Sequence, residues 1–264
     1  AVADGAERFV IATAGNAGVA LSAYGMRAGA APKIFAPSST PRTILQQIRA
    51  FGGQLEVLDG HIGHCGAAAR HYAAEYGAFD ISTLKEPYRI EGKKTMGLEI
   101  AEQLNWELPD VIIYPTGGGT GLIGMWKCFK ELRDAGWIGT TLPRMYCVQS
   151  QGCPPVIQAF ASGASTVEPW DDPQTVAVGL NVPAPIGGRL ALRALRESHG
   201  GAVAISDDAI LEEQRQAVNH MAIDFGPEGA ATLIALREFV TSGEIRSDDS
   251  VVLFNTGSGW LYRD

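Results

Sequence analysis

Residues 110–122 read Asp-Val-Ile-Ile-Tyr-Pro-Thr-Gly-Gly-Gly-Thr-Gly-Leu, an apolar run that breaks into glycines before Ile123-Gly124-Met125 resumes it. The pattern predicts a strand, a glycine loop (residues 116–121) and a helix. Residues without a Cβ let the backbone turn through positive φ and expose N–H groups at a helix start, where the helix dipole favours an anion. The spacing matches neither a P-loop nor G-x-G-x-x-G. We therefore expect either a tight turn or a site for a phosphate-bearing ligand.

Composition indicates an ordinary globular protein with a small-molecule partner. The chain has 264 residues, 46% hydrophobic and 19% charged, and a net charge of -8. That charge argues against nucleic acid or an acidic membrane surface as the partner. No apolar run approaches the roughly 18 residues of a membrane span, and no signal pattern opens the sequence. We expect a cytoplasmic protein.

The cysteine spacing favours buried thiols over metal ligands. The four cysteines are Cys65, Cys128, Cys147 and Cys153. No pair has C-x-x-C spacing, so we expect reduced and mostly buried side chains. His61, His64 and Cys65 suggest a metal, but they lie where a helix should start, so cap and surface roles are favoured and no metal is expected.

Strands and helices alternate along the first third of the chain. The expected strands are 8–12, 33–37, 54–58 and 78–82. The first expected helix follows the loop at 13–18 and ends near residue 27, and two more cover 41–51 and 64–76. Such alternation predicts a parallel sheet covered on both faces, with right-handed connections. We assign residues 1–83 to a smaller N-terminal α/β domain.

The rest of the chain predicts a second, larger α/β domain, residues 84–264. A turn-rich loop, 84–92, precedes a helix at 94–104 and the glycine loop, and residues 152–186 read as loops. Further strands are expected at 142–149, 202–205 and 250–255, and helices at 189–198, from 206, and at 230–242. The fold class is thus α/β, with two three-layer domains and mostly parallel sheets.

Three loops rich in Gly, Thr, Asn and Ser follow strands, at residues 13–18, 116–121 and 256–259. Ligands of open α/β sheets bind beyond the carboxyl ends of the strands. Each loop alone reads as a strand-ending turn. Together they favour one shared crevice.

These loops also resemble a known family. T-A-G-N at 13–16, P-T-G-G-G-T-G at 115–121 and N-T-G-S-G at 255–259 look like the fold-type II pyridoxal-phosphate enzymes related to the tryptophan synthase β chain. Within them, P-Y-R-I-E-G-K-K-T at 87–95 resembles a segment of threonine synthases. The similarity covers nearly all the chain. It implies two α/β domains, pyridoxal 5′-phosphate in the cleft between them, and a homodimer.

The resemblance also implies residue roles. The cofactor-binding residues would be Asn16, Gly117, Gly118, Gly119, Thr120, Gly121 and Thr256. Backbone N–H groups of the glycine loop would hold the phosphate, Asn16 would bind the 3′-oxygen, and Thr256 would face the pyridine nitrogen. Thr13, Ala14 and Gly15 would bind the substrate carboxylate, and Arg89 an anionic substrate group.

Two departures from the family pattern bear on function. The family's Schiff-base lysine lies upstream of the T-x-G-N loop and is not in this chain, so we assign no catalytic residue and expect truncation, processing or a missing front end. Lys93 and Lys94 are not promoted to that role. Residues 83–86, which bind substrate phosphate in threonine synthases, read Thr-Leu-Lys-Glu here. Leu84 cannot donate a hydrogen bond and Glu86 repels phosphate, although Lys85 offers compensation.

The sequence therefore predicts a lyase of the threonine synthase type that acts on a small amino acid, converting O-phosphohomoserine and water to threonine and phosphate. An alternative is a threonine or serine dehydratase or a diaminopropionate ammonia-lyase. A third possibility, of another class, is a non-catalytic homologue that binds the cofactor or an amino acid.

Overall fold

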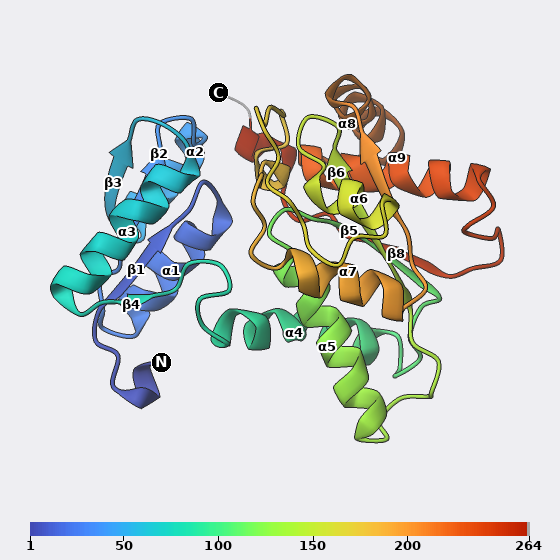
Figure 1. The fold of residues 1–264 in the computed structure, drawn as a ribbon, viewed down its shortest axis with the longest axis horizontal. Helices are drawn as coiled ribbons and strands as arrows, with labels where there is room; N and C mark the ends of the chain where they lie inside the picture. The colour runs from blue at the N-terminus through green and yellow to red at the C-terminus, as the bar shows by residue number, and fades with distance from the viewer. Residues whose placement is uncertain (263–264) are drawn as a thin grey trace. The chain divides into compact units, whose positions relative to one another are not determined.

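The computed structural model describes residues 1–262, which divide into two compact units. One unit comprises residues 1–89 with Leu261 and Tyr262, and the other comprises residues 90–260. Each contains a four-stranded parallel sheet with helices packed against it (Figure 1). The predicted α/β class with parallel sheets is confirmed. Within residues 1–262, no helix combines the length and apolar character that a membrane span requires.

The first unit is built around strand β1. Its elements are η1 (Val2–Asp4), β1 (Phe9–Ala12), α1 (Asn16–Arg27), β2 (Lys33–Pro37), α2 (Arg42–Ala50), β3 (Gln54–Leu58), α3 (Ile62–Tyr76) and β4 (Phe79–Asp80). The strand order is β3-β2-β1-β4. Val10 packs with Cys65 of α3, whereas Ile11 packs with Ile44 and Ile48 of α2. Because successive strand residues face opposite sides, β1 separates two small cores.

The second unit is built around strand β5. Its elements are β5 (Val111–Pro115), α5 (Thr120–Asp134), β6 (Arg144–Ser150), α6 (Pro155–Ala161), η2 (Val178–Leu180), α7 (Gly188–Glu197), β7 (Ala202–Ile205), α8 (Asp207–Met221), α9 (Pro227–Thr241) and β8 (Val251–Leu253). Helix α4 (Tyr88–Gln103) has its first two residues in the first unit, and η3 (Gly259–Tyr262) has its last two there. The strand order is β7-β6-β5-β8. All five residues of β5 are buried, as expected for a central parallel strand.

Three expectations about element limits were wrong. Residues 84–92 are not a single loop, because α4 begins at Tyr88. The Glu86 carboxylate accepts a hydrogen bond from the backbone N–H of Arg89 at 3.1 Å, which satisfies a donor in the first helical turn. Helix α9 begins at Pro227 rather than at 230, and proline is well suited to a first helical position. Residues 152–186 also contain the short helix α6.

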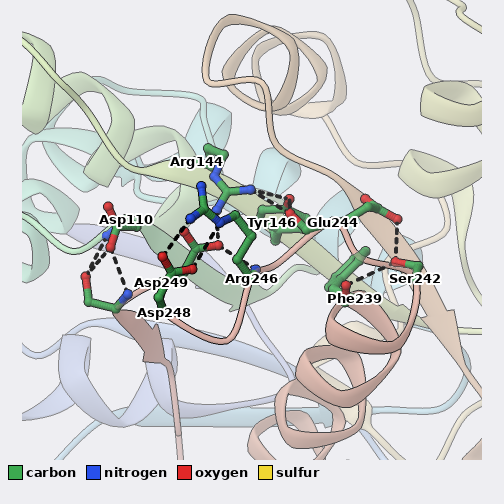
Figure 2. A network of polar contacts seen from close by, with 10 residues as sticks. Asp110, Arg144, Tyr146, Phe239, Ser242, Glu244, Arg246, Asp248 and Asp249 are labelled. Atoms are coloured by element: carbon green, nitrogen blue, oxygen red, sulfur yellow. Dashed lines mark hydrogen bonds and ion pairs between the residues drawn. The ribbon is translucent and has the colours of Figure 1, made fainter.

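A polar network fixes strand β8 beside β5 at the amino ends of the strands (Figure 2). Arg144, the first residue of β6, donates to the carbonyl of Glu244 at 2.6 Å and pairs with Asp249. The Asp110 carboxylate accepts from the backbone N–H of Ser250 at 2.8 Å and from its hydroxyl at 2.7 Å. The segments that follow β5 and β8 therefore leave the sheet as neighbours at its opposite edge.

Candidate functional site

The glycine loop joins the carboxyl end of β5 to helix α5. Thr116 is fully buried, and its N–H donates to the carbonyl of Val148 at 2.9 Å. Gly119 is the N-cap of α5 with φ of 84°, and no side chain caps the helix. The backbone N–H groups of residues 117–120 donate to no acceptor within residues 1–262. Free donors at the start of a 15-residue helix suit a phosphate group.

Close packing beneath the loop explains two of its glycines. A Cβ on Gly117 would collide with the carbonyl oxygen of Gly179 and lie 3.0 Å from Cγ2 of Val182. A Cβ on Gly121 would collide with the hydroxyl of Tyr114, so helix α5 could not approach the sheet. These glycines are required by packing, whatever part they take in ligand binding. The loop is a backbone cradle that fits a phosphate.

Residues 178–182 pack against Gly117 of the glycine loop. The sequence did not predict this contact. Glu228, at the start of α9 and only 4% exposed, accepts a hydrogen bond from the N–H of Gly179 at 2.7 Å. Oδ1 of Asn181 is buried and has no hydrogen-bond partner in the described part of the chain. Residues 152–186 lack a regular apolar period, so periodicity gave no signal there.

Thr256 follows β8, the neighbour of β5, so the structure brings it to the same edge of the sheet as the glycine loop. The Asp224 carboxylate accepts from the Ser258 hydroxyl at 3.2 Å and from the Trp260 N–H at 2.9 Å. The N–H of Gly226 donates to the carbonyl of Gly257 at 2.8 Å. These bonds fix residues 257–260, on the C-terminal side of Thr256. Thr256 itself is exposed.

In the first unit, residues 13–16 lie at the carboxyl end of β1. Gly15 is the N-cap of α1, and its N–H donates to Oγ1 of Thr13 at 3.2 Å. Thr13 is buried, Ala14 is partly buried and Asn16 is exposed. The predicted substrate-side residues therefore surround the start of a 12-residue helix.

Arg89 also belongs to the first unit, and it is a partly buried helical residue rather than a loop cation. Nη1 donates to the carbonyl of Ile81 at 3.2 Å and to Oγ1 of Thr83 at 3.1 Å. Burial lowers the pKa of its guanidinium. Lys85 pairs with Asp80 at 2.5 Å, so this lysine is already engaged within the protein.

The histidine at the start of α3 and the four cysteines have structural surroundings that can be compared with the predictions. Nδ1 of His61 accepts from the N–H of Gly63 at 3.0 Å, so His61 caps helix α3. All four cysteines are free and buried, as predicted. Burial raises the pKa of Cys147 to about 12. Residues 1–262 contain no group of three or more His, Cys, Asp or Glu side chains arranged to hold a metal.

Two parallel sheets with polar loops beyond their strand ends define a class of ligand-binding α/β proteins. Within that class, the chain belongs to the pyridoxal-phosphate dependent enzyme family, whose sequence profile matches residues 1–257. It is 32% identical to a threonine synthase of Methanosarcina acetivorans over 93% of this chain, and 30% identical to that of Methanocaldococcus jannaschii over 97%. It spans 60% and 63% of the length of these two relatives.

Solved structures of the same fold include enzymes with other activities. Maize serine racemase superposes with a TM-score of 0.79 at 21% identity, covering 100% of this chain and 78% of that one. An L-serine ammonia-lyase from Rhizomucor miehei also gives 0.79 at 21% identity, covering 98% and 82%. At these identities the likeness establishes the fold alone.

Proposed function

We propose that the protein is a pyridoxal-phosphate-dependent lyase of the threonine synthase type, which converts O-phosphohomoserine and water to threonine and phosphate. The observation that carries this proposal is the 32% identity to a threonine synthase across 93% of the chain. The family membership supports dependence on pyridoxal phosphate.

The proposal assigns distinct tasks to the loops. When bound, pyridoxal phosphate supplies an electron sink for reactions at the substrate's carbon atoms. The N–H groups of the glycine loop, with their helix start, bind its phosphate. Asn16 donates to the 3′-oxygen, and the Thr256 hydroxyl faces the ring nitrogen. Thr13, Ala14 and Gly15 bind the substrate carboxylate at the start of α1.

A second candidate function is an ammonia-lyase acting on threonine, serine or diaminopropionate. The observation that favours it is the state of residues 83–86. The Lys85 ammonium pairs with Asp80, so it is not free for a substrate phosphate, and the Glu86 carboxylate that caps α4 would repel one. Arg89 then remains as the cation proposed to bind it.

The domain limits at 83/84, a homodimer and a cytoplasmic location complete the proposal. The homodimer and location rest on the family resemblance and on the sequence, respectively. Light scattering of the purified protein at several concentrations tests the dimer, and a mass equal to one chain throughout would refute it.

The decisive assay uses the complete natural gene product with pyridoxal phosphate. We expect equal amounts of phosphate and threonine from O-phosphohomoserine, and little ammonia from threonine or serine. Ammonia release from threonine or serine without phosphate release would favour the second candidate. Tight cofactor binding with no turnover of any of these substrates would identify a non-catalytic homologue.

A further inference from the structure

Gln149 is a polar side chain buried completely at the end of β6. Nε2 donates to the carbonyl of Thr116 at 2.9 Å, at the entrance to the glycine loop. Oε1 accepts from the backbone N–H groups of Val156 at 3.0 Å and Ile157 at 3.3 Å, in the first turn of α6. These partners fix the amide orientation, because a flipped amide would set its NH₂ group against two N–H donors. One side chain thus joins the glycine loop to α6.

Thr116 is held at each of its polar groups. Its N–H donates to Val148, its hydroxyl donates to the carbonyl of Tyr114 at 3.0 Å, and its carbonyl accepts from Gln149. The carbonyl of Thr116 and the N–H of Gly117 belong to one trans peptide group, so they point in opposite directions. Holding the carbonyl toward Gln149 therefore aims the N–H of Gly117 away from Gln149.

We propose that Gln149 is a positioning residue for phosphate binding, which acts by fixing the Thr116–Gly117 peptide so that its N–H faces the phosphate. This inference rests on the proposed function of the glycine loop. A buried polar group costs free energy unless it is bonded, and Gln149 bonds three backbone groups, of which the Thr116 carbonyl and the Val156 N–H are in buried hydrogen bonds. Donors fixed in place before binding also hold an anion more tightly than mobile ones.

The test measures the dissociation constant of pyridoxal phosphate by fluorescence titration of the full chain at about pH 8 and about pH 5. Gln149→Glu keeps an acceptor for α6, but at pH 8 it sets a carboxylate against the Thr116 carbonyl. Burial raises the pKa of the introduced carboxyl, so at pH 5 its protonated form can again donate to Thr116. Gln149→Met removes both functions at similar volume. Gln151→Glu is the matched control, because Gln151 is exposed and donates to Ala204 instead.

Relative to the parent at the same pH, we expect Gln149→Glu to weaken binding about tenfold at pH 8 and about twofold at pH 5. Gln149→Met should weaken it about tenfold at both values, and Gln151→Glu should match the parent. Parent-like binding by Gln149→Met, or a weakening by Gln149→Glu that does not change with pH, would overturn the proposal. Urea unfolding of each variant verifies that it is folded at the titration pH. If Gln149→Glu is unfolded, the dissociation constant of Gln149→Met decides whether the proposal holds.

Gly118→Val separates this inference from the function on which it rests. A β-branched side chain in the loop should obstruct the approach of phosphate to bare backbone. If Gly118→Val binds the cofactor as well as the parent does, the proposed phosphate role of the loop fails. If it binds poorly while the Gln149 variants bind normally, only the positioning role fails.

Discussion

Gly117 and Gly179 meet backbone to backbone, with no room for a side chain on Gly117 between them. Gly179 is in turn held by the Glu228 carboxylate at 2.7 Å. The conformation of the glycine loop thus depends on Gly179, more than 60 residues further along the chain, and on Glu228, more than 110 residues further along.

Gly117→Ala should destabilise the protein and weaken cofactor binding. The new Cβ would push against a backbone carbonyl, which has no flexible end to give way, so we expect a loss of about 1–3 kcal/mol in unfolding free energy. Urea unfolding and cofactor titration measure the two effects. Gly139→Ala is the control, because a Cβ there meets no described atom within 4 Å. Equal stability and affinity in both variants would show that the loop can move away from Gly179.

Glu228→Ala should leave the N–H of Gly179 without its acceptor. This hydrogen bond is only partly buried, so we expect its loss to cost about 1 kcal/mol, and residues 178–182 should loosen beside the loop. We expect lower stability in urea together with weaker cofactor binding. Glu238→Ala, on the exposed side of the same helix, should change neither. Unaltered cofactor affinity in a destabilised Glu228→Ala protein would separate this support from the ligand site.

Arg89→Lys should affect a phosphorylated substrate more than an unphosphorylated one. The guanidinium donates to Thr83 and Ile81 through Nη1 alone, so its other nitrogens can donate to an anion, whereas lysine offers a single point charge. In the complete, active protein we expect kcat/KM for O-phosphohomoserine to fall at least about tenfold, with smaller losses for threonine and serine. Equal losses on all three would indicate a general structural role.

Glu197 should make stability depend on pH in acid. Hydrogen bonds, first from the Trp126 indole and then from Arg193, lower its pKa to about 2. A lowered pKa stabilises the fold above the unfolded-state value of about 4.3, and this contribution disappears as pH falls toward about 2. Because the side chain is 33% exposed, we expect only about 1 kcal/mol. Urea unfolding of Glu197→Gln between pH 6 and 2.5 should show a shallower decline than the parent, and identical slopes would refute the assignment.

The strands of both sheets could be predicted because their signal is local. The predicted strands 33–37, 54–58 and 202–205 match the observed limits. The start of α4 at Tyr88 was missed because it depends on a cap from Glu86. Pro87, directly before Tyr88, reads as a turn residue.

The loops of the site could be located from the sequence, but their supports could not. Gly117 and Thr116 lie in a motif, whereas Gly179 and Gln149 reach them only through the folded sheet. Nothing in the composition around Gly179 distinguishes a supporting segment from a surface loop. Long-range contacts of this kind have no sequence period.

The burial of all four cysteines makes the protein well suited to site-specific labelling. Burial raises the pKa of Cys128 to about 11 as well as that of Cys147, so almost no thiolate is present near neutral pH. A cysteine introduced at an exposed position such as Tyr24 would be the most reactive thiol by a wide margin. Maleimide dyes or spin labels could then be attached at one chosen point without first removing the natural cysteines.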